Sequence, residues 1–325
     1  MNHLTGILKR NDLLQKFVDP RVTATGARRA SVRMNALHTL WFNTGTLCNL
    51  ACRSCFIESS PTNDRLVYLS AAEVKVFLDE IERDGHPTQE IGFTGGEPFM
   101  NPEIVDMLEA ALHRRLRVVV LTNAMNPMIK WAKELGRLDR EHPGQLIIRV
   151  SVDHYTRVRH EQERGQRSWQ PMLRGLSWLA ENDFSVRVAG RTCWKESESD
   201  LRSGYRQLFA KIGLSLDAFN PEHLILFPDM DIRHEAPEVT EECWDLLGVR
   251  PDSVMCANSR MVVKRKNASA PTVVSCTLLP YDSQFELGRT LAEAACEVSL
   301  NHPFCAQFCV VGGGSCGTDQ GCQSS

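Results

Sequence analysis

Three cysteines fall within eight residues of the chain, at the spacing C-x3-C-x2-C. They are Cys48, Cys52 and Cys55. Three thiolates on one short loop can surround one corner of a [4Fe-4S] cubane, because the intervening residues are just enough to wrap the chain around the irons. The remaining iron then keeps an open position, where a small molecule can bind and receive an electron.

Two other interpretations of these cysteines stay open at this point. Structural zinc prefers four tetrahedral nitrogen or sulfur ligands, usually supplied by two C-x2-C pairs that lie some distance apart. Three unrelated thiols are the second alternative. The observed spacing favours the iron-sulfur cluster over both.

A second motif, Gly95-Gly96-Glu97-Pro98, stands where a predicted strand ends. The two glycines allow the backbone to approach a ligand closely, and Pro98 stiffens the exit from the turn. Exposed carbonyls and the Glu97 carboxylate make a rim rich in hydrogen-bond acceptors, which suits an ammonium group. Such a turn by itself is commonly an ordinary strand-to-helix connection, but here it follows the cysteine loop at the next strand end.

Together the two motifs resemble those of the radical S-adenosylmethionine (SAM) superfamily. The resemblance implies that the open iron chelates the amino and carboxylate groups of SAM, and that the glycine motif grips its amino group through Gly95, Gly96 and Glu97. One position departs from the family pattern. The family usually has an aromatic residue or histidine before the third cysteine, packed beside adenine, but here that residue is Ser54, and Phe56 comes one position after Cys55.

Later strand ends carry further residues to which the resemblance gives roles. Ser151 and Asp153 fit a family contact with the SAM ribose. Arg191, with Arg187 as the alternative, fits the basic residue that contacts the SAM carboxylate. For each of them, an ordinary cap, turn or surface ion pair is the other interpretation.

The C-terminal part of the chain contains a second group of cysteines. The order of cysteine, predicted hairpin, cysteine, short helix and close cysteine pair resembles the SPASM or twitch domains of many radical SAM enzymes. That resemblance implies an auxiliary [4Fe-4S] cluster bound by Cys256, Cys276, Cys305 and Cys309, which could relay electrons or tune a potential. The last pair is C-x3-C where C-x2-C is common, Cys316 is a rival ligand, and zinc on the same thiols stays open.

Short β-rich runs alternate with longer helical patterns from residue 38 onward, which is typical of βα units around a parallel sheet. We predict strands at 38–43, 90–93, 117–121, 146–152, 185–189 and 223–227, and helices at 70–83, 102–114, 127–135, 169–181 and 199–212. The fold class is therefore α/β, a partial (β/α)6 TIM-type barrel. In such barrels the chemistry gathers at the carboxyl ends of the strands, where both motifs lie.

Three segments follow from these patterns. Residues 1–37 are expected to form an amphipathic helix and a basic segment, residues 38–230 the partial barrel, and residues 231–325 a small cysteine-rich α+β domain. The 325 residues suffice for one large domain and a smaller one.

Composition limits the function classes. The 37 basic and 40 acidic residues give a net charge of −3, which does not indicate a nucleic-acid surface. The N-terminus has no secretory signal pattern, and no apolar run reaches the roughly 18 residues that span a bilayer. We therefore expect a cytoplasmic protein whose cysteines bind metal rather than form disulfides.

The activity that the resemblance implies is reductive cleavage of SAM to a 5'-deoxyadenosyl radical, which abstracts hydrogen from a small-molecule or peptide substrate. The auxiliary cluster would then accept an electron from the substrate, for a net oxidation. A flavodoxin-type or ferredoxin-type protein would be the electron donor. The alternative from another class is a non-catalytic protein that binds or delivers iron-sulfur clusters or zinc, which would not require the glycine motif.

Overall fold

The computed structural model describes residues 16–230 and 235–314. They divide into two compact units. The barrel unit contains Ala36–Phe227 and Ser259–Ala294, and the terminal unit contains the rest of the chain. Each unit is described by itself.

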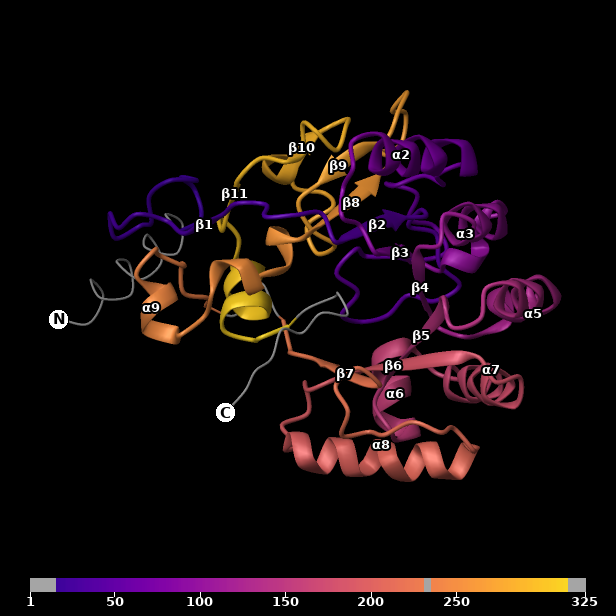
Figure 1. Cartoon of the computed structure of the whole chain (residues 1–325). Coiled ribbons are helices and arrows are strands. Elements are labelled where there is room, and N and C mark those ends of the chain that lie inside the picture. The colour runs from indigo at the N-terminus through magenta and orange to yellow at the C-terminus, as the bar shows by residue number, and fades with distance from the viewer. Residues whose placement is uncertain (1–15, 231–234, 315–325) are drawn as a thin grey trace. The chain divides into compact units, whose positions relative to one another are not determined.

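Six strands of the barrel unit follow one another in parallel, in the order of the sequence (Figure 1). They are β2 (Thr39–Asn43), β3 (Glu90–Thr94), β4 (Arg117–Thr122), β5 (Leu146–Asp153), β6 (Ser185–Arg191) and β7 (Leu224–Phe227). Helices connect them, as expected for parallel strands, which need a crossover between them. The predicted partial barrel of six βα units is confirmed.

Local sequence signals explain where several helices begin. The connecting helices are α2 (Ala71–Arg83), α3 (Ile104–Leu112), α4 (Asn126–Ile129), α5 (Ala132–Glu141), α6 (Arg157–Arg164), α7 (Trp169–Glu181) and α8 (Glu198–Ile212). The Ser70 hydroxyl accepts the backbone N–H of Glu73, and the Glu73 carboxylate accepts the N–H of Ser70. This is the capping box that the sequence predicts at the start of α2.

Two helical segments differ from the prediction. The helix expected at 127–135 is divided into α4 and α5, because Trp131 leaves helical geometry and donates its indole N–H to the Phe99 carbonyl at 3.1 Å. Helix α6 is absent from the helices that the sequence predicts. Its buried face consists of His160 and Glu163, so an apolar stripe is missing from its sequence.

The sheet continues beyond the six βα units. Strand β8 (Ser259–Val263) pairs in parallel with β2, and β9 (Thr272–Val274) pairs antiparallel with β8, followed by β10 (Glu286–Gly288). The predicted hairpin is present, but it extends the barrel sheet, whereas the predicted boundary assigns it to residues 231–325. The physical reason is that β2 is buried, so the backbone N–H and C=O groups along its free edge need a pairing strand, which β8 supplies.

Helices cover one side of the strands, and the side chains between helices and strands are apolar. Phe42 of β2 stacks on Phe93 of β3, with ring centroids 5.6 Å apart, and meets Phe77 of α2 edge-on. On the opposite side of β2, the Trp41 indole lies over Gly92, where any Cβ would come within 2.2 Å of the ring. The packing of both sides therefore fixes the register of β2 against β3.

The terminal unit consists of short elements. Strands β1 (Ser31–Val32) and β11 (Val298–Ser299) form an antiparallel pair, and the helical segments include α9 (Cys243–Leu247) and a π-helical turn (Cys305–Val310). A buried ion pair joins Arg29 to Glu238. The predicted amphipathic helix falls largely on residues 1–15, outside the described residues. Within the described part of the chain, no helix has the length and apolar character needed to cross a bilayer.

Candidate metal centre

The cysteine loop follows β2 at its carboxyl end. The loop is closed at its base, where the Cys48 N–H donates to the Ser60 carbonyl at 3.0 Å. Cys48 is buried, and Cys52 and Cys55 are half-buried. All three predicted ligands therefore belong to one short closed loop at the end of the sheet where the glycine motif also lies.

Backbone N–H groups point at two of the three thiols. Leu50 N lies 3.4 Å from Cys48 Sγ, and Ser59 N lies 3.3 Å from Cys55 Sγ. Burial raises the pKa of Cys48 to about 12 and also raises the pKa of Cys52. These thiols thus keep their protons until a metal displaces them, which makes metal binding pH-dependent.

The positions of the thiols do not by themselves define a ligand set. Across residues 16–230 and 235–314, no three His, Cys, Asp or Glu side chains gather as closely as ligands of one metal ion do. The assignment of Cys48, Cys52 and Cys55 as cluster ligands stays a prediction.

The glycine motif lies directly against the backbone that leads into the cysteine loop. Gly96 N donates to the Gly45 carbonyl at 2.8 Å, and Glu97 N donates to the Leu47 carbonyl at 3.1 Å. A Cβ at Gly95 would lie 2.5 Å from the Gly45 oxygen, and one at Gly96 would lie 2.2 Å from the Leu47 oxygen. Gly95 also has a φ of +140°, which residues with a side chain rarely adopt. Only glycine allows these two segments to meet.

The Glu97 carboxylate is fully buried and accepts three hydrogen bonds. Thr122 Oγ1 donates to Oε1 at 2.8 Å, Asn123 N donates to Oε2 at 2.9 Å, and Phe99 N donates to Oε1 at 3.3 Å. Burial raises the pKa of Glu97 to about 7, against the opposing effect of these donors. Asn123 also donates its side-chain amide to Asn49 of the cysteine loop at 2.9 Å. Glu97 and Asn123 thus connect the ends of β3 and β4 to that loop.

The predicted ribose contacts lie at the end of β5. Ser151 is half-buried on the strand, and Asp153 stands at its end with a φ of +58°, next to a register shift. Asp153 accepts both a 2.6 Å bond from Arg164 Nε and a 3.2 Å bond from Arg164 Nη2. Such a two-point contact fixes the carboxylate plane, and a backbone held in this sparsely populated region is common at functional sites.

Arg191 is buried at the end of β6 and reaches the cysteine loop. Its Nη1 lies 3.0 Å from Glu163 Oε1 and 3.4 Å from the Ser54 carbonyl, and its guanidinium lies 5.3 Å from the centroid of the Phe56 ring. Nε and Nη2 are buried and have no hydrogen-bond partner among the described residues. Arg187 lies four residues earlier on β6, away from the strand end. Of the two arginines, Arg191 is therefore the one beside the loop.

Helix α6 supplies residues that the sequence analysis did not assign to the site. Glu163 accepts the Ser54 backbone N–H at 2.8 Å and its hydroxyl at 3.1 Å, and its own carbonyl accepts the Arg53 N–H at 2.8 Å. Arg164 forms an ion pair with Asp153. No motif marks these two residues. The only signal is an adjacent acid and base shortly after the fourth predicted strand.

The predicted auxiliary ligands are divided between the two units. Cys256, Cys305 and Cys309 belong to the terminal unit, where Cys305 and Cys309 share the π-helical turn. Cys276 follows β9 in the barrel unit, and burial raises the pKa of its thiol. Cys316, the rival ligand, lies outside the described residues.

Comparisons with known proteins show the family and the fold of the chain. The model of the Radical SAM superfamily matches residues 42–208, slightly more than half of the chain. The antilisterial bacteriocin subtilosin biosynthesis protein AlbA of Bacillus subtilis (strain 168) is 28% identical over 169 residues, which cover 52% of this chain and 35% of AlbA. The chain spans about a third of the length of the curated relatives that it matches.

Two solved structures share the fold at low sequence identity. The structure of anSMEcpe with bound AdoMet has a TM-score of 0.56 and 14% identity, covering 79% of this chain and 77% of that one. The structure of Streptococcus suis SuiB bound to S-adenosylmethionine has a TM-score of 0.55 and 12% identity, covering 78% of this chain and 63% of that one.

Proposed function

Since the chain belongs to the radical SAM superfamily, we propose that Cys48, Cys52 and Cys55 bind the [4Fe-4S] cluster that this family uses together with SAM. When bound, the cluster supplies the electron for reductive cleavage of SAM, which leads to hydrogen abstraction from the substrate. One observation supports the proposal above all. At the carboxyl ends of the strands, the Gly95–Glu97 turn contacts the backbone that leads into the cysteine loop, and Arg191 contacts the loop itself.

The donors and acceptors around this loop fit the amino-acid part of SAM. Arg191 keeps Nε and Nη2 buried without an acceptor among the described residues, which is costly unless a ligand such as a carboxylate pairs with them. On the other side, the Glu97 carboxylate and the carbonyls of the Gly95–Gly96 turn provide acceptors for an ammonium group. We assign the carboxylate of SAM to Arg191 and its amino group to Gly95, Gly96 and Glu97.

Two residues at the end of β5 complete the proposed SAM site. The Oδ atoms of Asp153 are held by Arg164, so Asp153 is positioned before any ligand binds. The half-buried Ser151 lies two residues earlier on the same strand, before the register shift. We propose that these two residues contact the ribose hydroxyls of SAM.

We propose a peptide as the substrate, with a small molecule as the alternative. The support is the similarity to AlbA, whose name assigns it to the biosynthesis of a bacteriocin. That similarity covers 52% of this chain and 35% of AlbA. A flavodoxin-type or ferredoxin-type protein is the proposed electron donor.

We propose an auxiliary [4Fe-4S] cluster on Cys256, Cys276, Cys305 and Cys309. Four thiolates would saturate such a cluster, so it could pass electrons but could not bind SAM. Its role would be to accept the electron that a net oxidation of the substrate releases. Burial raises the pKa of Cys276, so this thiol would have to release a proton in order to bind a metal.

The test combines iron analysis with an assay for SAM cleavage. Anaerobically reconstituted protein, reduced with SAM present, should form 5'-deoxyadenosine even without substrate. Cys48→Ala should abolish both the cluster at this loop and the product. Cys243→Ala is the matched control, because this half-buried thiol is outside both predicted ligand sets, and it should retain both. A protein that binds only zinc, or that has iron but leaves SAM intact, would overturn the proposal.

A further inference from the structure

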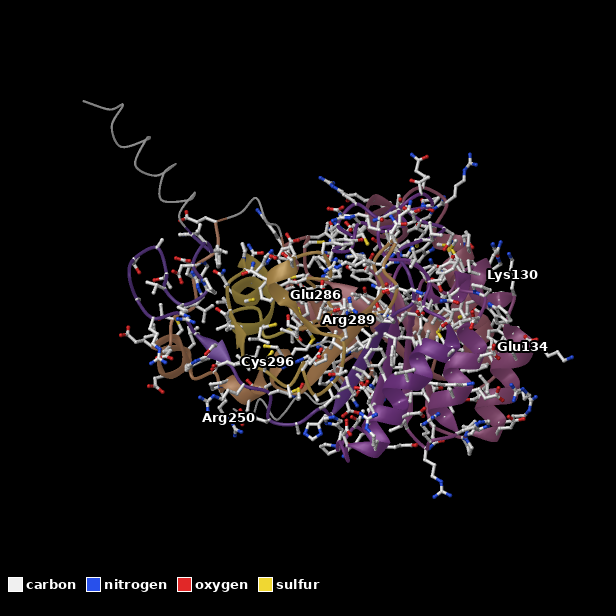
Figure 2. All side chains as sticks on the ribbon, turned by 90° about the horizontal axis from the view of Figure 1, so that it is seen from above. Lys130, Glu134, Arg250, Glu286, Arg289 and Cys296 are labelled. Carbon is white, nitrogen blue, oxygen red and sulfur yellow. The ribbon has the colours of Figure 1, made fainter. Side chains whose placement is uncertain are left out.

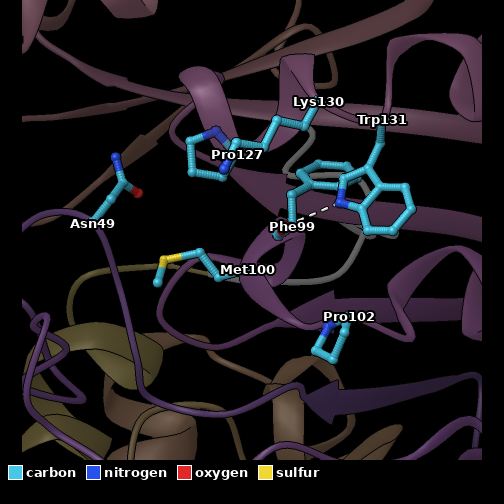
Figure 3. Close-up of a pocket in the computed structure, with 7 residues that line it drawn as sticks. All are labelled: Asn49, Phe99, Met100, Pro102, Pro127, Lys130 and Trp131. Atoms are coloured by element: carbon cyan, nitrogen blue, oxygen red, sulfur yellow. Dashed lines mark hydrogen bonds between the residues drawn. The ribbon is translucent and has the colours of Figure 1, made fainter.

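An open pocket lies on the barrel unit beside the cysteine loop, and its walls are mostly apolar. Its volume is about 540 Å³, within the range of about 300–1,000 Å³ that is usual for ligand sites. Phe99 and Met100 come from the turn after the glycine motif, and Pro127 and Trp131 lie on and just after α4. Figure 3 shows them together with Asn49 of the cysteine loop. The pocket therefore lies close to the carboxyl ends of the strands, where barrel enzymes bind their substrates.

Hydrogen bonds fix two walls of this pocket before any ligand binds. The Trp131 indole N–H donates to the Phe99 carbonyl at 3.1 Å (Figure 3), so the ring is held against the turn and its N–H is already used. On the cysteine loop, Asn49 Oδ1 accepts the side-chain amide of Asn123 at 2.9 Å. Because these walls are already ordered, little conformational entropy is lost when a ligand binds.

The side-chain polar groups that this pocket leaves to a ligand are donors. Lys130 is exposed at the rim and forms no ion pair with any described residue; Glu134, at the same edge of the barrel unit (Figure 2), is not part of the lining. Asn49 Nδ2 lies 3.5 Å from Met125 Sδ, and because a thioether is a weak acceptor this amide keeps donor capacity. Among the described lining residues the one side-chain oxygen is Asn49 Oδ1, which Asn123 occupies. The pocket therefore suits a ligand that presents acceptors, one of them anionic.

We propose that this pocket binds the C-terminal residue of a peptide, which combines an apolar side chain with one free carboxylate. The single carboxylate matches the single cation of the lining, Lys130. The apolar side chain packs against the half-buried Met100, Pro127 and Trp131, and the carbonyl of the preceding residue accepts Asn49 Nδ2. The choice of a peptide rests on the proposed function, but the lining contains no cysteine, so binding needs no metal.

This orientation directs the rest of the peptide toward the cysteine loop. Lys130 and Asn49 lie on opposite sides of the opening (Figure 3), so a chain whose carboxylate is at Lys130 leaves the pocket past Asn49. Asn49 is the residue next to Cys48. Residues a short distance before the C-terminus of the peptide then come nearest to the proposed SAM site, and they are the ones exposed to its chemistry.

Titration of the full-length protein with short peptides tests the proposal without any turnover. The probe is the tripeptide alanyl-alanyl-phenylalanine, and its C-terminal amide is the matched ligand that lacks the charge. Ligand-observed NMR at pH 7 measures the dissociation constants for the metal-free and the reconstituted protein.

Three variants separate the contributions of the pocket. Lys130→Met removes the cation but keeps an apolar stem, and Asn49→Asp loses the donor but keeps an oxygen for Asn123. Lys75→Met is the matched control, because it makes the same change at an exposed lysine of α2 that does not line the pocket. Thermal unfolding of each variant checks that it folds like the wild type.

We expect the wild type to bind the free acid saturably, with the same affinity in the metal-free and the reconstituted protein. The amide should bind about threefold to fivefold more weakly, because an exposed ion pair contributes about that much. Lys130→Met should weaken binding of the acid by the same factor and should bind acid and amide alike. Asn49→Asp should weaken binding of the acid at least as much, since it places a like charge beside the carboxylate. Lys75→Met should match the wild type.

Other outcomes overturn the inference in distinguishable ways. Equal affinities of acid and amide in the wild type, or equal losses in Lys130→Met and Lys75→Met, would show that Lys130 does not bind the carboxylate. Hydrocinnamate has the phenyl ring and the carboxylate but no peptide group, so binding as tight as that of the tripeptide would make this a site for a small acid. No saturable binding of any probe would remove the site itself. The expected selectivity in a protein that holds no cluster would support this inference while the proposed function fails.

Discussion

Glu163 accepts a hydrogen bond from the guanidinium of Arg191, with 3.0 Å between Oε1 and Nη1. The same carboxylate binds the backbone N–H and the hydroxyl of Ser54, between the second and third cysteines of the loop. Both side chains are buried, with exposures of 7% for Glu163 and 8% for Arg191. A single carboxylate on α6 therefore connects the end of β6 to the proposed cluster loop.

Removal of this carboxylate should destabilise the barrel strongly. Glu163→Ala leaves the buried Arg191 charge without its partner, and breaking one side of a buried pair costs about 3–5 kcal/mol. Urea unfolding of the metal-free protein measures the loss. The control is Glu198→Ala, which breaks an ion pair whose carboxylate is 66% exposed and should cost at most about 1 kcal/mol. Comparable losses in the two variants would contradict the structural role of Glu163.

The close contact at Gly96 predicts a second large effect. Gly96→Ala places a Cβ 2.2 Å from the Leu47 carbonyl, so the backbone leading into the cysteine loop has to move. We expect a loss of about 3 kcal/mol, the upper part of the usual range for overpacking, together with poor incorporation of iron. Iron content and unfolding midpoints measure both.

Gly136→Ala is the matched control for that variant. Gly136 lies within α5, and its nearest neighbour is the end of the flexible Arg140 side chain at 3.3 Å. Alanine there should stabilise the helix by about 0.5–1 kcal/mol, because glycine loses more backbone entropy on folding. If both alanines were tolerated equally, the tight approach of the two loops would not be required.

The sequence predicts the six βα units well, because their signals are local. Strands such as Val118–Val120 are continuous apolar runs, and the capping box at Ser70 marks the start of a helix. The glycine motif could also be placed at a strand end. Its close approach to Gly45 and Leu47 could not be predicted, since that contact depends on two loops far apart in the chain.

What the sequence does not reveal lies mainly in the polar interior. Helix α6 buries His160 and Glu163, so hydrophobic periodicity does not detect it. Phe56 departs from the family pattern by following Cys55, and only the structure shows that its ring lies beneath the Arg191 guanidinium. The addition of β8 to the edge of β2 is a long-range pairing, which no local pattern specifies.

Burial of Glu97 predicts a pH dependence of stability with a definite sign. Its pKa rises from an ordinary 4.5 to about 7 in the folded protein. Between these values the folded state holds a proton that the unfolded state has released, so the free energy of unfolding falls as pH rises through this window. The full effect is on the order of 3 kcal/mol, present below pH 4.5 and lost above pH 7.

Glu97→Gln isolates this contribution, because an amide of the same shape does not titrate. We expect the difference in unfolding free energy between the wild type and Glu97→Gln to change between pH 5 and pH 8, in favour of the variant at the higher pH. Urea titrations of the metal-free proteins at both values measure it. A difference that is constant with pH would show that Glu97 is ionised throughout.

Iron counting distinguishes the two proposed clusters. With both present, the reconstituted wild type should hold about eight irons per chain, and Cys305→Ser should hold about four. Because Cys305 lies in the terminal unit and outside the proposed SAM site, this variant should still cleave SAM to 5'-deoxyadenosine. Cys48→Ser should also lose about four irons, but it should lose cleavage as well.

Comparing Cys305→Ser with Cys48→Ser shows which of the two clusters is needed for SAM cleavage. Loss of iron without loss of cleavage in Cys305→Ser, beside loss of both in Cys48→Ser, assigns one cluster to SAM and the other to a different role. Cys243→Ser controls for the removal of any cysteine, and it should match the wild type in both measurements. A wild type with only about four irons, all lost in Cys48→Ser, would mean that the C-terminal thiols do not bind a second cluster. Zinc retained there in place of iron would assign them a structural role, because zinc has no redox chemistry.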